Sequence, residues 1–224
     1  MSDDLGSDQG DIAAVVLAAG ASRRFGSDKL LHPLTLRGVT LPLAAHSLLP
    51  WLETFGQISV VVRLGANVFR SAIEAALGIG KGGTDKSAAI NWVTCAEAAQ
   101  GMAASLACGV RANRDAAGWL IGLADMPAVP SAAIAGVRDA LSTGAALAAP
   151  SCDGRRGHPV GFASHYYDAL LALQGDNGAR RLLERDRSKV VEIKIGDTGI
   201  FADIDIPGDL QHLGKIPAYN RSSK

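Results

Sequence analysis

The sequence predicts a single α/β domain of three layers, in which helices cover both faces of a mostly parallel, Rossmann-like sheet. Segments with strand and helix character alternate over the first ~150 residues, which is the pattern of parallel βαβ units. The earliest strand candidate, 13–19, is apolar or small throughout, as in a strand covered on both faces. Hydrophobic residues make up 48% of the 224 residues, which is enough for one large core.

Apolar runs of strand length predict strands at 15–17, 58–65, 90–95, 118–127, 145–151, 158–164, 190–196 and 201–206. Helical periodicity predicts helices at 41–53, 67–77, 101–113, 131–141, 178–186 and 207–213. Pro50 is expected to disturb the end of the first helix. Gly78 is expected to end the second helix, and Ser131 to cap the start of the fourth.

Charge and composition exclude several classes of protein. The 22 basic and 22 acidic residues cancel, so no overall field attracts the chain to nucleic acid or to an anionic membrane. No run of ~18 apolar residues predicts a membrane span, and the acidic start of the chain is unlike a signal peptide. We expect a cytoplasmic protein of one domain, 1–224, with flexible tails at 1–11 and 218–224 and a flexible loop at 78–86.

The cysteines predict no metal site. Cys95, Cys108 and Cys152 are few, odd in number and far apart, and none has the spacing of zinc ligands. We therefore expect three reduced thiols, as is usual for a cytosolic protein.

A small and positively charged loop follows the first predicted strand. The stretch LAAGASRRFGSDK, 17–29, places Gly20 at the strand end and then Arg23, Arg24 and Lys29. Glycine permits a close approach of the backbone to a ligand, and loop amides together with cations suit a polyphosphate. The spacing fits neither a P-loop nor the GxGxxG dinucleotide fingerprint. By itself the stretch is open to two interpretations, a phosphate-binding loop and a basic surface turn.

The same stretch closely resembles the LAAGxSxRMGxxK signature of the nucleotidyltransferases of the molybdenum cofactor (MobA-like) family. The matching residues are Leu17, Ala18, Ala19, Gly20, Ser22, Arg24, Gly26 and Lys29. Phe25 stands where the signature has methionine. Later segments that resemble the family are GMAASLACGV (101–110), LADMP (123–127), GRRGHPVGF (154–162), LQGDNGARRLL (173–183) and DIDIPGDL (203–210). The last departs from DIDTPEDL at Ile206 and Gly208, and the likeness is greatest to the cytidylyl-transferring branch.

The resemblance implies an α/β fold of the nucleotide-diphospho-sugar transferase type and a nucleotidyl transfer. A phosphate oxygen of the acceptor would attack the α-phosphorus of CTP, and pyrophosphate would leave. Such an acceptor is already ionised at neutral pH, so no general base is required. The expected cofactor is Mg²⁺ and the expected acceptor is molybdopterin or its molybdenum-loaded form. The expected partner is a molybdoenzyme of the xanthine dehydrogenase type or its chaperone.

The preference for CTP rests on three short segments that resemble the cytidylyl branch. Ala18-Ala19-Gly20 resembles the cytidylyl branch, whereas the guanylyl branch has Ala-Gly-Gly. The Cβ of Ala19 would narrow the pocket against a purine. The GHP and GDxGAR segments also resemble the cytidylyl branch.

Roles for individual side chains follow from the resemblance and from charge. Arg24 would hold the β- and γ-phosphates and Lys29 the α-phosphate. Further nucleotide contacts would come from Leu17, Ala18, Ala19, Gly20, Ser22, Gly26 and Ser105, the last reaching the ribose or base. Asp125 and Asp205 would bind Mg²⁺, with Asp203 on the same face of a strand as Asp205. The alternatives are a helix-capping role for Asp125 and an N-cap role for Asp205.

A second group of residues is assigned to the acceptor. The resemblance places Arg156, His158, Asp176 and Arg180 there, with Arg155 as a further cation. The start of the helix at 178–186 can receive an anion. The alternatives are a structural histidine and solvated arginines. Met102 and Leu106, which share a helix with Ser105, are expected in the core.

Two other functions fit the same residues. One is a cytidylyltransferase acting on a sugar- or polyol-phosphate, and the other is a non-catalytic module that delivers a nucleotide or cofactor. The presence of both Lys29 and Asp125 counts against the delivery module. A dinucleotide-dependent oxidoreductase is disfavoured because its glycine fingerprint is absent.

Overall fold

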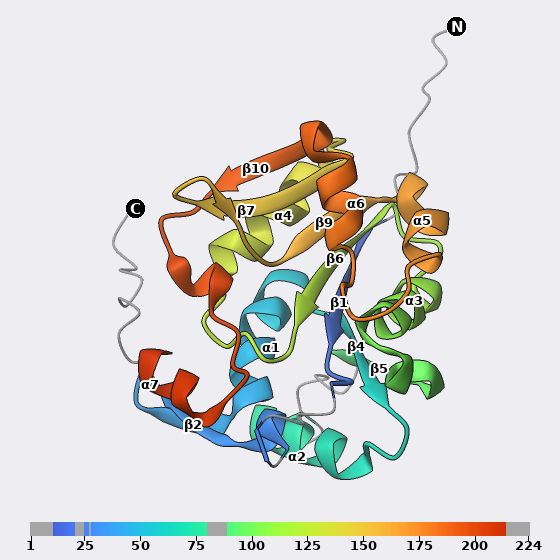
Figure 1. Cartoon of the computed structure of the whole chain (residues 1–224). Helices are drawn as coiled ribbons and strands as arrows, with labels where there is room; N and C mark the ends of the chain where they lie inside the picture. Colours follow the sequence, from blue (N-terminus) through green and yellow to red (C-terminus); the bar gives the residue numbers. More distant parts are fainter. Residues whose placement is uncertain (1–10, 21–24, 27, 80–88, 214–224) are drawn as a thin grey trace, which may run out of the picture.

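The computed structural model describes residues 11–20, 25–26, 28–79 and 89–213. In this part of the chain an eight-stranded sheet runs in the order β10-β7-β9-β6-β1-β4-β5, with β8 beside β7 (Figure 1). The strands are β1 (Ile12–Leu17), β4 (Ile58–Arg63), β5 (Ile90–Cys95), β6 (Gly118–Leu123), β7 (Leu147–Cys152), β8 (Arg155–Arg156), β9 (Val160–Ala163) and β10 (Val190–Lys194). A separate hairpin joins β2 (Pro33–Leu36) to β3 (Val39–Pro42).

Helices cover both faces of the sheet. They are α1 (Leu43–Phe55), α2 (Asn67–Leu77), α3 (Met102–Ala112), α4 (Ser131–Ser142), α5 (Tyr167–Leu171), α6 (Arg180–Arg185) and α7 (Leu210–Leu213). Short 3₁₀ helices that matter below are η1 (Lys29–Leu31), η3 (Ala96–Gln100), η6 (Thr198–Phe201) and η7 (Pro207–Asp209). Buried residues of α1, α2 and α4 share one hydrophobic cluster, and those of α3, α5 and α6 share a second. The predicted three-layer α/β fold is confirmed.

The sheet is parallel in its first half and mixed in its second. β1 pairs in parallel with β4 and with β6, and β4 pairs in parallel with β5. β10 is also parallel to β7, whereas β9 runs antiparallel to both β6 and β7. The carboxyl ends of β1, β4 and β6 therefore open on the same edge of the sheet, which is where ligands bind in such folds.

Strand β1 is buried on both faces, as its unbroken apolar run predicts. Ala14 and Val16 belong to one hydrophobic cluster, and Val15 and Leu17 belong to the other. Two glycines allow the covering helices to approach closely. A Cβ on Gly109 of α3 would collide with Val15, and a Cβ on Gly122 of β6 would collide with Trp51 of α1. Glycine at these positions lets both helices pack directly against the sheet.

The hairpin β2–β3 is not among the predicted elements. Because β3 extends to Pro42, the helix predicted at 41–53 begins at Leu43. The ring Nε2 of His46 lies 2.8 Å from the carbonyl oxygen of Leu34, which ties the hairpin to α1. The four-residue strands are too short to stand out from the apolar helix that follows them.

Pro50 lies inside α1, which continues to Phe55. Leu48 and Trp51 are buried on either side of the proline. Their packing offsets the backbone hydrogen bond that proline cannot make. The Thr54 hydroxyl donates to the Pro50 carbonyl at 2.7 Å. The expected disturbance at Pro50 therefore does not end the helix.

Two further local predictions are wrong. Ser131 is the first residue of α4 rather than its cap, because Pro130 occupies the N-cap position; the Ser131 hydroxyl donates to Glu53 at 3.3 Å. The segment 201–206 is not a strand. It is an irregular connection between η6 and η7 at the edge of the sheet. The Ile204 N–H donates to the Asp125 carbonyl at 3.0 Å, which holds the connection in place.

The cysteines and one methionine also differ from expectation. Cys95, the last residue of β5, forms a disulfide with Cys108 of α3, so the expectation of three reduced thiols is wrong. The pairing depends on α3 folding back over β5, which spacing along the chain does not reveal. Cys152 is free and buried. Met102 is 40% exposed rather than part of the core, whereas Leu106 is buried.

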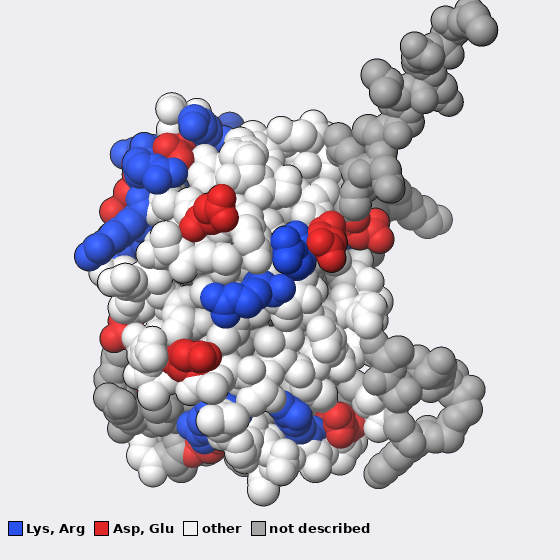
Figure 2. All heavy atoms as spheres, turned by 90° about the vertical axis from the view of Figure 1, so that its right-hand side faces the viewer, with Lys and Arg blue, Asp and Glu red and all other residues white. Residues whose placement is uncertain are grey.

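The surface carries both signs of charge. Figure 2 shows basic and acidic side chains interspersed in small groups on one face. Among the described residues, no helix is long and apolar enough to cross a membrane. The predicted tail at 218–224 and most of the predicted loop at 78–86 lie outside the described residues.

Candidate active site

The ends of β1 and β6 form a shared rim. Leu17 and Leu123 are the last paired residues of the two strands, and the Ala124 N–H donates to the Leu17 carbonyl at 3.0 Å. Ala18 and Ala19 follow β1 and are each 8% exposed, and Gly20 beyond them is exposed. The predicted glycine loop therefore starts beside the segment that carries Asp125.

Lys29 reaches this rim from η1. The Asp28 side chain caps η1 by accepting a backbone N–H, which fixes the position of the lysine. The Lys29 Nζ donates to Asp125 Oδ2 at 2.7 Å and to Asp205 Oδ1 at 3.2 Å. It also donates to the Ile204 carbonyl at 2.6 Å. We call Lys29, Asp125 and Asp205 the Lys29 cluster.

The Lys29 cluster holds a buried cation. The Lys29 side chain is 10% exposed, against 22% for Asp125 and 40% for Asp205. Burial lowers the pKa of Lys29, but the two carboxylates outweigh it and the net shift of the pKa is upward. Lys29 is therefore an ammonium ion throughout the neutral range.

The donor set of the cluster fits a divalent cation. Asp125 Oδ1 is buried and has no hydrogen-bond partner among the described residues. A buried carboxylate oxygen without a partner is costly unless something else contacts it. Mg²⁺ and Mn²⁺ take carboxylate oxygens as ligands, and Asp125 and Asp205 already face one positive charge together.

The alternative capping roles of the two aspartates are wrong. Asp125 precedes the N-cap of α4, which is Pro130. In the other segment Asp209 turns back, and its Oδ2 accepts the N–H groups of Asp205 and Ile206 at 2.8 Å each. Asp209 thus does the capping, and the Asp205 carboxylate is directed to Lys29.

His158 lies close enough to Asp125 and Asp203 to interact with both carboxylates. The backbone N–H of His158 donates to the Ile200 carbonyl at 2.9 Å, and the peptide bond between His158 and Pro159 is cis. Burial lowers the pKa of His158 below 6.5, although Asp125 and Asp203 act in the opposite direction. The ring is therefore neutral at pH 7, and its buried Nδ1 has no hydrogen-bond partner in the described part of the chain.

The other residues that were predicted to bind the acceptor substrate have described partners outside the Lys29 cluster. Arg156 pairs with Glu192 at 2.7 Å, and Arg180 pairs with Glu184 at 2.8 Å on the surface of α6. Asp176 lies against the start of α3, where a Cβ on Gly101 would come within 2.5 Å of its Oδ1. The guanidinium of Arg155 stacks over the Phe201 ring at 4.6 Å.

The nucleotide residues are placed in part. Gly26 has a φ of +80°, which favours glycine, and Ser105 is buried in α3. Phe25, which replaces the methionine of the signature, is buried and packs against His32 with ring centroids 5.3 Å apart. Ser22 and Arg24 lie outside the described residues.

Sequence reasoning missed two polar side chains at the rim. Arg63, the last residue of β4, pairs with Asp28 at 3.3 Å and approaches the Gly20 carbonyl at 3.5 Å. A surface hollow here is lined by Ala18, Gly20, Asp28, Leu30, Leu31, Arg63, Gly65, Ala66, Val68 and Phe69. The available signal was the single charged residue at the end of a largely apolar strand.

Comparison with known proteins identifies the family. A family model described as a MobA-like NTP transferase domain matches residues 14–190. The chain belongs to this family. The matched range includes both Lys29 and Asp125. The nucleotidyltransferase family predicted from the motifs is confirmed.

Individual relatives of the MobA-like chain agree with this assignment. The Bacillus subtilis (strain 168) purine catabolism protein PucB is 28% identical over 221 residues, covering 88% of this chain and 92% of that protein. The structure of Rv0371c from Mycobacterium tuberculosis H37Rv has a TM-score of 0.70 and 26% identity, covering 92% of this chain and all of that one. A structure of Rv0371c with manganese has a TM-score of 0.66 and 26% identity, covering 91% of this chain and 97% of that one.

Proposed function

We propose that the chain transfers CMP from CTP to the phosphate of molybdopterin, or of its molybdenum-loaded form, and releases pyrophosphate. The observation that carries the proposal is the convergence of Lys29, Asp125 and Asp205 at the carboxyl ends of β1 and β6. Nucleotidyl transfer redistributes a high negative charge, so its catalysis depends on alignment and on nearby positive charge. The Lys29 cluster offers both, beside the glycine loop.

Each side chain has a distinct part in the proposal. Asp125 and Asp205 would hold a divalent cation, expected to be Mg²⁺, which when bound neutralises phosphate oxygens. A structure of Rv0371c is a complex with manganese, which supports a role for a divalent cation in this proposal. Lys29 carries its charge on a flexible stem and suits the α-phosphate. Arg24 would hold the β- and γ-phosphates, and the residues around Gly20 and Gly26 would contact the nucleotide.

The acceptor side is built around His158. A neutral imidazole can donate one hydrogen bond to the acceptor phosphate without removing a proton, and none needs to be removed from an ionised phosphate. In this proposal Arg156 and Arg180 exchange their present partners, Glu192 and Glu184, for the acceptor. Asp176, which lies at the start of α3, belongs to the same side.

The choice of CTP and molybdopterin rests on the sequence motifs. The name of PucB places that relative in purine catabolism, which supports a partner enzyme that oxidises purines, of the xanthine dehydrogenase type, or its chaperone. The proposed place of action is the cytoplasm. No role toward nucleic acid or membrane is proposed.

The test is pyrophosphate release with Mg²⁺ or Mn²⁺, comparing CTP, GTP and ATP with and without molybdopterin. Release that prefers CTP and needs molybdopterin is the expected result. Release that needs a sugar- or polyol-phosphate instead would reassign the acceptor. Nucleotide binding without turnover under any condition would favour a delivery module.

A further inference from the structure

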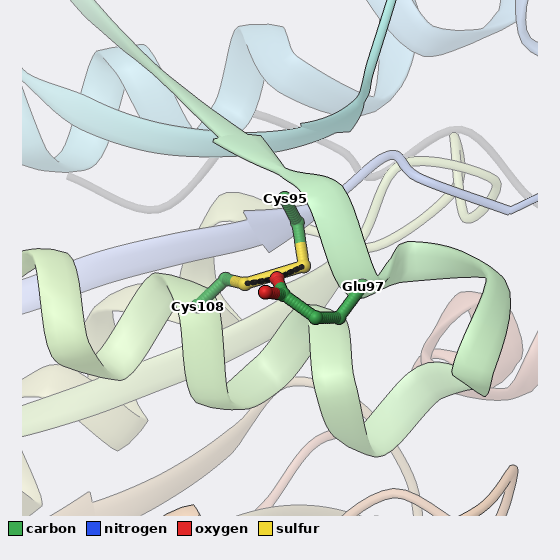
Figure 3. Close-up of side chains that lie close together, drawn as sticks. All are labelled: Cys95, Glu97 and Cys108. Atoms are coloured by element: carbon green, nitrogen blue, oxygen red, sulfur yellow. Dashed lines mark hydrogen bonds between the residues drawn. A yellow bond between two sulfur atoms is a disulfide. The ribbon is translucent and has the colours of Figure 1, made fainter.

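A cysteine pair with a neighbouring carboxylate shares no residue with the Lys29 cluster. Cys95 ends β5, and Cys108 lies in α3 (Figure 3). Their Cα atoms are 5.8 Å apart, within the range that a disulfide spans without movement of the backbone. Glu97 of η3 extends its Oε2 to within 3.9 Å of the Cys95 sulfur and 3.8 Å of the Cys108 sulfur.

The two sulfurs differ in their access to solvent. Cys95 is 1% exposed, whereas Cys108 is only partly buried. A reagent in solution therefore meets Cys108 first and Cys95 only through it. An accessible cysteine backed by a buried one is the arrangement needed for two successive thiol–disulfide exchanges.

We infer that Cys95 and Cys108 form a reversible modification site that exchanges with small-molecule disulfides such as glutathione disulfide. In the reduced protein the Cys108 thiolate attacks one sulfur of the small disulfide and releases one thiol. The Cys95 thiolate then attacks the Cys108 sulfur of the mixed disulfide and releases the second thiol. Two electrons pass from the cysteine pair to the small disulfide, and the two protons of the cysteine thiols end on the released thiols. A dithiol reverses both steps.

Glu97 controls the rate of this exchange. In the reduced protein its carboxylate accepts hydrogen bonds from the thiols, and its negative charge disfavours the thiolate that must attack. The pair is therefore slow to oxidise near neutral pH. A variant Glu97→Gln keeps the shape and removes the charge, so it oxidises several-fold faster.

The bond has a structural consequence for one segment. It closes the part of the chain that contains η3 and the first half of α3. The start of α3 contacts the loop before α6, because the Ala103 N–H donates to the Gly175 carbonyl at 3.0 Å. Oxidation ties this segment to β5, so the oxidised protein resists thermal unfolding better than the reduced protein.

The test is titration of the full chain with mixtures of reduced and oxidised glutathione. Three free thiols are expected in the reduced protein and one after oxidation, counted in denaturant, with Cys95 and Cys108 in one cross-linked pair of peptides by mass. In Cys95→Ser the reaction stops at a glutathione adduct on Cys108, and in Cys152→Ser it proceeds as in the wild type. The oxidised wild type melts at a higher temperature than the reduced protein, and Cys108→Ser shows no such difference.

Three results would overturn the inference. In the first, the pair stays reduced in excess oxidised glutathione. In the second, Cys152 is found in the cross-link. In the third, the reduced protein holds one equivalent of zinc that blocks oxidation and is lost in Glu97→Gln, which would assign the three side chains to a metal. None of these measurements uses nucleotide, so the inference stands or fails independently of the proposed transfer.

Discussion

Two ion-pair clusters in the described part of the chain are built differently. The Lys29 cluster joins side chains 96 and 176 positions apart, around an ammonium that is 10% exposed. The second, which we call the Asp186 cluster, consists of Tyr166, Arg185, Asp186 and Lys189. There the Asp186 carboxylate accepts from the Tyr166 hydroxyl at 2.9 Å and from Arg185 at 2.7 Å, with Lys189 at 4.0 Å.

The difference lies in how completely each carboxylate is satisfied. Hydrogen bonds from Arg185, the larger contribution, and from Tyr166 lower the pKa of Asp186 from 3.8 to about 2. A carboxylate whose pKa is lowered on folding stabilises the folded protein at neutral pH. Asp125 is paired through one oxygen, while its other oxygen is buried without a partner in the described part of the chain. Incomplete satisfaction of a buried charge costs stability, and it is expected where a ligand completes the site.

The largest expected effect comes from Asp125→Asn. The change removes the carboxylate that bonds Lys29 most closely, and we expect nucleotidyl transfer to fall at least about a hundredfold. Mn²⁺ binding, followed by electron paramagnetic resonance, should fall with it. The matched control is Asp186→Asn, which removes an aspartate charge from the other cluster and should leave both measurements unchanged. Equal losses in both variants would contradict a special role for the Lys29 cluster.

Lys29→Met should separate binding from chemistry. Removing the ammonium should lower transfer about a hundredfold, because in the proposed function Lys29 supplies positive charge to the transferring phosphate. Binding of Mn²⁺ in the absence of nucleotide should become tighter, since the ammonium no longer occupies the space between Asp125 and Asp205. Lys194→Met in β10 is a control. Weaker Mn²⁺ binding in Lys29→Met would show that the lysine organises the carboxylates rather than competing with the cation.

Asp205→Asn should have a smaller effect than Asp125→Asn. Its side chain is 40% exposed and its bond to Lys29 is longer, 3.2 Å. In this proposal Asp205 contributes one charge-assisted contact to the cation, worth about 1.5 kcal/mol. Its loss corresponds to roughly tenfold weaker Mn²⁺ binding. Isothermal titration with Mn²⁺ measures the difference. An effect as large as that of Asp125→Asn would mean that the two carboxylates contribute equally.

The Asp186 cluster should affect stability alone, and its effect should disappear in acid. The pKa of Asp186 is lower in the folded protein than its ordinary 3.8, so its stabilising effect is present above about pH 4. That effect is lost as the pH falls toward 2. Thermal unfolding of the wild type and Asp186→Asn should therefore differ at neutral pH and converge in acid. Parallel melting curves at every pH would contradict this assignment.

Local elements were predictable where local forces decide them. The strand at 90–95 and the helix at 67–77 have the predicted bounds, and Gly78 ends that helix in a left-handed conformation. The hairpin at 33–42 and the irregular path of 201–206 were not predicted. Short strands give little periodic signal, and an apolar alternation is compatible with an extended segment that joins no sheet.

The sequence by itself determined the α/β class, the buried strand β1 and the family, because apolar periodicity and a long motif depend only on the order of neighbouring residues in the chain. Tertiary structure alone decided that Lys29 lies between Asp125 and Asp205, that Asp209 rather than Asp205 does the capping, and that Cys95 meets Cys108. The physical reason is that periodicity reports which face of an element is buried. Contacts between distant side chains depend on the order of strands in the sheet and on the packing of helices over it.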